Sequence, residues 1–308
     1  MKAAIDIGTN TVLLLVAEIK NGVLKPVFEE QRIPRLGKGV DADRMINEAA
    51  TKRVADALLE YRAILDEKFP EVREVIVTAT SAVRDARNKT VFMEAIRKQT
   101  GFQIRLLSGK EEAEWTAAGA LSVIKGDFSD QETLILDIGG GSTEVAQLRK
   151  GEVTDGHSFD MGSVRFTERF LKKDPPSKDQ IEQCRKEVAD YFTRRLFDTG
   201  ESANAVGVAG TVTSLAAMSL DLQVYDPVKL AGHILTIRDV KEAITRFSEH
   251  SADQMLEQYP VYLKGRADIF LAGLLILEGF LTHFGIESMI VSTGGIRHGA
   301  ILNNVSSR

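Results

Sequence analysis

The chain has 308 residues, of which 44% are hydrophobic and 27% are charged, and its formal net charge is −5. This length allows two domains with a core each, and the composition excludes a disordered or low-complexity protein. The negative charge argues against a general nucleic-acid binder, so any phosphate site must supply its own local positive charge. The single cysteine, Cys184, excludes an intramolecular disulfide.

The amino terminus enters an apolar strand directly and does not resemble a signal peptide. No apolar run reaches the roughly 18 residues that a membrane span needs. We therefore expect a cytoplasmic protein with neither membrane nor nucleic acid among its partners. The exposed helices permit a homodimer without demanding one.

The first half of the chain is predicted to hold three antiparallel strands, followed by alternating helices and strands. In order, the pattern predicts a strand from residue 2, a turn at DIGTNT, a strand over 12–19, a turn at Asn21-Gly22, a strand ending at Phe28, a helix over 47–68, a strand over 74–78, a helix after Asn88 and a strand over 103–107. Asn-Gly between two apolar runs is typical of a tight hairpin.

The second half repeats this order. It predicts strands over 133–137, 143–148, 153–159 and 205–209, a turn at Lys150-Gly151, and helices from Ser163 and Ser177. Such a repeat predicts an α/β fold of two domains, each a mixed five-stranded sheet flanked by helices, with a cleft between them. We place the domains at residues 1–124 and 125–294, and a C-terminal helix over 295–308 is a candidate to join the first.

Each half also carries a copy of one short motif. Residues 4–11 read AIDIGTNT and residues 135–142 read ILDIGGGS, so that Asp6 and Asp137 each follow an apolar strand and precede a glycine turn. Glycine turns let backbone amides approach an anion, although one such turn alone is equally well explained by a tight hairpin. The two aspartates could likewise serve as turn formers through Asx hydrogen bonds.

Two further strand, glycine, helix junctions follow, at residues 207–213 and 292–299. Four junctions of this kind favour an extended phosphate site over packing alone. The candidate phosphate-binding residues are Asp6, Gly8, Thr9, Asn10, Gly139, Gly140, Gly141, Ser142, Gly210 and Thr211. Glu144 stands close after the second turn, and with Asp137 it offers the two hard oxygen ligands that suit Mg²⁺ or another divalent cation.

Two charged residues are candidates for catalysis. Ser108 and Glu111 fit a helix capping box, which leaves Glu112 in the first turn without a capping role. Glu112 could simply complement the helix dipole, but its place beside the expected cleft makes it our candidate to orient and deprotonate water. Arg84 follows a strand and could bind phosphate oxygens in a fork, although a solvated arginine is the ordinary outcome.

Seven motifs in order resemble those of the exopolyphosphatase and guanosine pentaphosphate phosphatase family, within the sugar kinase, Hsp70 and actin superfamily. They are DIGTNT, ATSAVRDARN, SGKEEA, DIGGGSTE, MGSVRFTE, GVAGTVTSLAA and STGGIRHGAI. The resemblance implies two actin-like (ribonuclease H-like) domains, with Glu112 as catalytic base, Arg84 as an active-site arginine, and Asp137 and Glu144 as metal ligands. Thr293 stands where the family usually has an acidic residue, and the chain resembles the short two-domain form.

The resulting hypothesis is an Mg²⁺-dependent exopolyphosphatase that releases orthophosphate from inorganic polyphosphate, with a preference for short chains. Guanosine pentaphosphate is the alternative substrate, because it shares the phosphate tail. Other classes are an ATP-dependent small-molecule kinase on the same fold, a non-catalytic alarmone sensor and an actin-like filament protein. The candidate base favours hydrolysis over these.

Overall fold

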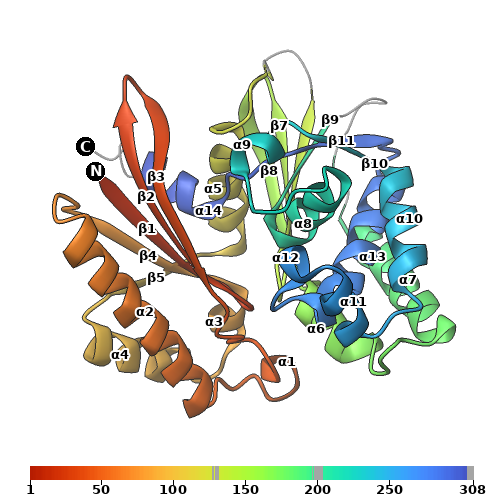
Figure 1. The fold of residues 1–308 in the computed structure, drawn as a ribbon, viewed down its shortest axis with the longest axis horizontal. Coiled ribbons are helices and arrows are strands. Elements are labelled where there is room, and N and C mark those ends of the chain that lie inside the picture. Colours follow the sequence, from red (N-terminus) through yellow and green to blue (C-terminus); the bar gives the residue numbers. More distant parts are fainter. Residues whose placement is uncertain (127, 129–131, 196, 198–203, 304–308) are drawn as a thin grey trace. The chain divides into compact units, whose positions relative to one another are not determined.

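The computed structural model describes residues 1–126, 128, 132–195, 197 and 204–303. The chain divides into two compact units, shown with their elements in Figure 1. Unit 1 comprises Met1–Ser122 and Gly294–Arg308, and unit 2 comprises Val123–Thr293. The C-terminal helix predicted over 295–308 is present as α14 (Ile296–Asn303), and residues 304–308 lie outside the described part of the chain.

A mixed five-stranded sheet forms the centre of unit 1, in the order β3-β2-β1-β4-β5. Its strands are β1 (Lys2–Ile7), β2 (Val12–Lys20), β3 (Val23–Arg32), β4 (Val75–Ala79) and β5 (Ile104–Leu106). The turn between β2 and β3 has positive φ at Asn21 and at Gly22. These are the dihedrals that a two-residue hairpin requires, and the predicted tight hairpin is therefore confirmed.

Helices cover both faces of this first sheet. They are α1 (Val40–Asp43), α2 (Glu48–Lys68), α3 (Ser81–Asp85), α4 (Lys89–Thr100), α5 (Gly109–Leu121) and α14. The helix predicted over 47–68 is confirmed as α2, and the side chain of Asn47 caps it by accepting from the Ala50 amide. Alternation along β1 sends Ile5 into the core under α2 and Ala4 into the cluster with α5 and α14.

Helix α14 is held tightly in unit 1 although it comes from the far end of the sequence. Arg297 donates to the carbonyl of Leu14 at 2.9 Å, and its guanidinium forms an ion pair with Glu29 at 3.0 Å. A Cβ atom added at Gly119 of α5 would overlap the Gly295 carbonyl, and one added at Gly299 would overlap the carbonyl of Trp115. Helices α5 and α14 thus meet backbone to backbone.

Unit 2 contains a six-stranded mixed sheet in the order β10-β11-β9-β6-β7-β8. Its strands are β6 (Thr133–Ile138), β7 (Thr143–Arg149), β8 (Glu152–Phe159), β9 (Asn204–Val208), β10 (Ile234–Thr236) and β11 (Ser288–Val291). Two mixed sheets were correctly predicted, but five strands for the second was one too few. The three-residue β10 pairs antiparallel with β11, and so short a strand has no readable alternation.

The helices of unit 2 share one large apolar core with its sheet. They are α6 (Ser163–Phe170), α7 (Lys178–Thr193), α8 (Ala209–Ser219), α9 (Pro227–Leu230), α10 (Ile237–Phe247), α11 (Ala252–Gln258), α12 (Pro260–Leu263) and α13 (Ala267–His283). Helix α13 is buried over most of its surface. No helix in the described part of the chain is long and apolar enough to cross a membrane.

His298 of α14 is buried, and its Nδ1 atom accepts from the amide of Gly295 at 3.4 Å. Burial, reinforced by the neighbouring charge of Arg297, lowers the pKa of His298 from 6.5 to about 3. The imidazole is therefore neutral in the folded protein but takes up a proton in the unfolded chain below pH 6.5. The stability that depends on the neutral ring is present above this pH and is lost as the pH falls towards 3.

As the pH falls from about 7.5 to about 5, we expect His298 to lower the free energy of unfolding by about 2 kcal/mol. In His298→Asn, whose amide oxygen can replace Nδ1 as acceptor, urea unfolding should show a pH dependence weaker by about that amount. His250→Asn, at a partly exposed histidine, serves as the control. An unchanged pH dependence in His298→Asn would contradict the prediction.

Candidate functional site

In unit 1 the candidate residues gather at the carboxyl ends of three parallel strands. Asp6 of β1 pairs in register with Thr78 of β4, and the Thr78 hydroxyl donates to the Asp6 carboxylate at 3.2 Å. Beyond β4, the Ser81 hydroxyl lies 3.1 Å from that of Thr9. All four side chains are buried, so the first motif and the start of α3 form one polar cluster at the edge where α/β sheets bind ligands.

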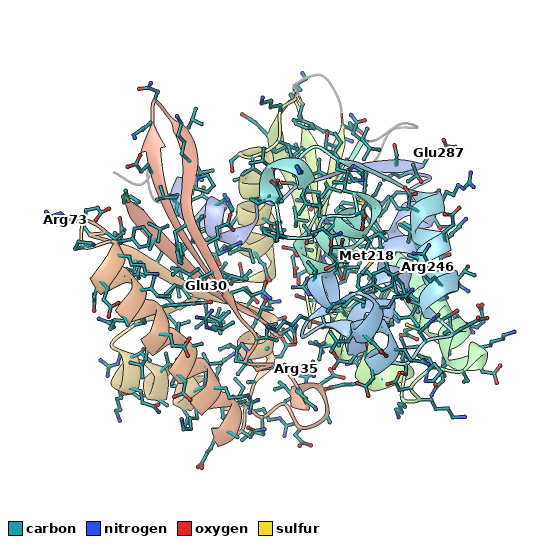
Figure 2. The ribbon with its side chains drawn as sticks, in the orientation of Figure 1. Glu30, Arg35, Arg73, Met218, Arg246 and Glu287 are labelled. Carbon is teal, nitrogen blue, oxygen red and sulfur yellow. The ribbon has the colours of Figure 1, made fainter. Side chains whose placement is uncertain are left out.

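The first glycine turn is held from one side by the segment that follows β3. The Gly8 amide donates to the Thr11 carbonyl at 2.9 Å and closes the turn. The Thr9 carbonyl accepts from the Gly37 amide at 2.7 Å, and the Asn10 carbonyl accepts from the Arg35 amide at 3.0 Å. Figure 2 labels Arg35 on this segment, beside α1. This support could not be predicted from the sequence, because nothing local links residues 35–37 to the turn.

Glu112 and Arg84 form an ion pair in the same unit, in which the carboxylate is buried and the guanidinium is partly exposed. Helix α5 begins with the predicted capping box between Ser108 and Glu111, which places Glu112 in its first turn. The Glu112 side chain is only 5% exposed, and its Oε2 accepts from Nη1 of Arg84 at 2.7 Å. The same nitrogen donates to the Leu107 carbonyl at 3.2 Å. A guanidinium in this position, together with the helix dipole, stabilises an ionised carboxylate.

In unit 2 the two candidate metal ligands are direct neighbours. Asp137 and Glu144 are register partners on the antiparallel strands β6 and β7, so their side chains project from the same face. Both are buried, and Glu144 also accepts from the Ser158 hydroxyl at 2.5 Å. Two adjacent buried carboxylates suit a divalent cation whose remaining ligands are water and phosphate oxygens. The described residues include no cluster of three or more His, Cys, Asp or Glu side chains arranged for a metal.

The second glycine turn follows Asp137 and repeats the geometry of the first. The Gly139 amide donates to the Ser142 carbonyl at 3.0 Å. The Gly140 carbonyl accepts from the amides of Val164 and Arg165, at 2.8 and 3.1 Å, at the start of α6. In both units, therefore, the segment after the third strand donates hydrogen bonds to carbonyl groups of the glycine turn.

The start of α8 lies at the same edge of the second sheet, because Val208 at the end of β9 pairs in register with Asp137. A Cβ atom added at Gly210 would overlap Nη1 of Arg266, so the guanidinium rests directly on the first turn of α8. Burial lowers the pKa of Arg266. The hydroxyl of Thr211 lies against Gly273 of α13, so that of the two donors of Thr211 the main-chain amide is the candidate for a phosphate.

The two copies of the motif differ at one strand position. Asp6 has Leu13 as its register partner on β2, whereas Asp137 has Glu144 on β7. The first copy thus offers one carboxylate with a hydroxyl neighbour, and the second offers a carboxylate pair. Only the second has the donor set that a divalent cation prefers.

The structure brings the predicted residues together within each unit. Those of unit 1 are Asp6, Gly8, Thr9, Asn10, Arg84 and Glu112, and those of unit 2 are Asp137, Gly139, Gly140, Gly141, Ser142, Glu144, Gly210 and Thr211. No role was predicted for Thr78, Ser81 or Arg165, although Ser81 and Arg165 lie within the motifs quoted above and Thr78 directly precedes one of them. For Thr78 and Ser81, a hydroxyl side chain at the end of an apolar strand or just after it was the available indication.

Comparison with known protein families finds a match over residues 15–308 to the family described as the Ppx/GppA phosphatase family. Exopolyphosphatase 2 of Mycobacterium tuberculosis is 32% identical over 316 residues, covering 98% of this chain and 97% of that protein. A bifunctional 3-dehydroquinate synthase/phosphatase of Fusobacterium nucleatum is 31% identical over the whole chain, which spans 47% of that longer protein.

Solved structures show the same similarity. The Aquifex aeolicus member of the Ppx/GppA family superimposes with a TM-score of 0.82 at 29% identity, covering 99% of this chain and 97% of that one. An exopolyphosphatase from Cytophaga hutchinsonii gives a TM-score of 0.90 at 28% identity, with the same coverage. The similarity extends over both units.

Proposed function

Because this chain belongs to the Ppx/GppA phosphatase family, we propose that it is an exopolyphosphatase, which hydrolyses the terminal phosphoanhydride bond of inorganic polyphosphate and releases orthophosphate. The observation that carries this proposal is the buried Glu112 carboxylate, held by Arg84 in the first turn of α5. A carboxylate fixed in this way by a guanidinium is suited to act as a base towards water.

Glu112 would orient a water molecule and accept its proton while the water oxygen attacks the terminal phosphorus in line. The bond from phosphorus to the bridging oxygen breaks, and the chain shortened by one phosphate departs. Arg84 would hold the carboxylate in place and offset negative charge that develops on the phosphoryl oxygens. The amides of the glycine turns would bind those oxygens, since peptide N–H groups are donors that need no proton transfer.

The carboxylates of Asp137 and Glu144 would hold Mg²⁺ in unit 2. When bound, the ion supplies positive charge that neutralises phosphate oxygens. The Ser158 hydroxyl donates to one Glu144 oxygen and so fixes this carboxylate where the ion would bind. The half-buried Arg266 beside the first turn of α8 would add a positive charge near Gly210.

Glu144→Gln tests the metal proposal, since the amide keeps the size of the side chain and an oxygen that can accept from Ser158. We expect the Mg²⁺ concentration for half-maximal phosphate release to rise at least about tenfold. The thermal stabilisation that Mg²⁺ confers should fall in parallel. Glu152→Gln, at an exposed glutamate of β8, is the matched control, and an unchanged Mg²⁺ requirement in Glu144→Gln would remove this residue from the metal site.

The substrate is tested by measuring phosphate release from defined short and long polyphosphates, and from guanosine pentaphosphate, at equal concentrations. Faster release from short polyphosphate supports the proposal together with its preference for short chains. Faster release from guanosine pentaphosphate would assign the alternative activity. Consumption of ATP only in the presence of an acceptor would instead indicate a kinase.

A further inference from the structure

Three carbonyl groups of the second glycine turn, those of Gly139, Gly140 and Gly141, point towards α6. The Gly139 carbonyl accepts from Ser163, through its amide at 2.9 Å and its hydroxyl at 3.3 Å. The next carbonyl, of Gly140, accepts from the first-turn amides of α6, and that of Gly141 accepts from Nε of Arg165 at 2.6 Å. Three successive peptide groups are thus held from one side.

A trans peptide points its C=O and its N–H in opposite directions. The bond to the Gly139 carbonyl therefore turns the Gly140 amide away from α6, and the bonds to the next two carbonyls do the same for the amides of Gly141 and Ser142. Three consecutive amides that face one way form a nest for an anion. An anion would therefore bind on the side of the turn opposite to α6.

Arg165 is the one side chain in this set that carries a charge. It is buried, and its Nε lies closer to the turn than any of the other donors to these three carbonyls. A charged donor on a carbonyl polarises the whole peptide, which makes the opposite N–H a stronger donor. In unit 1 the equivalent carbonyl, of Asn10, accepts from the main-chain amide of Arg35 at 3.0 Å.

We propose that Arg165 is a positioning residue, which orients and polarises the amides of the Gly139–Ser142 turn for a phosphate group that it does not itself bind. This proposal rests on the proposed function, because the phosphate is taken to be that of the substrate. Gly162 takes part through its lack of a side chain. A Cβ atom there would lie 2.5 Å from the carbonyl carbon and oxygen of Gly140 and would push the turn off α6.

The test measures binding of imidodiphosphate, in which a P–N–P bridge replaces the anhydride, by calorimetry in the presence of Mg²⁺. Arg165→Gln should weaken binding by about 10- to 100-fold, the range of one lost hydrogen bond to a charged group. Gly162→Ala should weaken it comparably although the charge of the protein is unchanged. Arg169→Gln, one turn further along α6 and exposed, should bind as the wild type does.

Arg165→Gln and Gly162→Ala together distinguish a positioning role of Arg165 from direct ligand binding and from a purely structural role. If Arg165→Gln weakens binding while Gly162→Ala does not, Arg165 acts as a direct cation for the ligand and the proposal is wrong. If Arg165→Gln lowers the unfolding temperature but binds normally, its role is structural and the proposal is again wrong. Absence of binding in the wild type would contradict the proposed function itself, whereas normal wild-type binding with no effect of either variant would contradict only this inference.

Discussion

Glu112→Gln should lower phosphate release by about 10²- to 10⁴-fold, the contribution typical of a general base. Glutamine keeps the length of the side chain and an oxygen that can accept from Arg84, so the contact at 2.7 Å can persist in part. What it cannot do is accept the proton of water. Imidodiphosphate binding, measured by calorimetry, should therefore stay close to that of the wild type.

The neighbouring glutamate provides the control. Glu111 lies on the same turn of α5 and completes the capping box with Ser108, and glutamine can serve in that motif as well. Glu111→Gln should consequently retain both turnover and stability. Full turnover in Glu112→Gln would remove Glu112 from the mechanism, and loss of ligand binding would assign it to substrate recognition.

Gly299→Ala should destabilise the protein by about 3 kcal/mol, at the upper end of what overpacking costs. The added methyl group would overlap the main chain of Trp115, which has no rotamer with which to withdraw. Helix α5 would have to shift, and Glu112 moves with it. A displacement of about 1 Å at a catalytic group can cost about 10²-fold in rate, so we expect turnover to fall as well.

Gly295→Ala is the matched control for this variant. An added Cβ atom at Gly295 would meet no atom within 4 Å, although this residue stands only four positions earlier. Urea unfolding and phosphate release of both variants, measured beside the wild type, test the contrast. Equal stability of the two variants would show that α5 and α14 have more freedom than their backbone contact implies.

Local rules explain what could be predicted from the sequence. The hairpin at Asn21-Gly22, the capping box at Ser108 and the boundaries of α2 each depend on a few adjacent residues, and the structure has all three. The doubled motif led correctly to two sheets of similar order, because strand, glycine turn and strand recur in both halves.

Long-range packing explains what could not be predicted. Within a helix a glycine is expected to lower helix stability. Nothing in the neighbouring sequence shows that Gly119 and Gly299 let two distant helices touch. The amides that donate to the carbonyls of each glycine turn lie more than twenty residues away along the chain, as with Gly37 and Thr9. Such partners emerge only once the sheet has brought the strand ends together.

Unit 1 is assembled from both ends of the chain, and this has a consequence for the order of events during synthesis. Unit 2 is continuous, so all of its residues have been made before α14 leaves the ribosome. At about 5–20 residues per second, roughly 10–30 seconds pass before α14 joins α5 on the second face of the sheet of unit 1. During that interval Trp115 and Leu15, which α14 helps to bury, are candidates for chaperone binding.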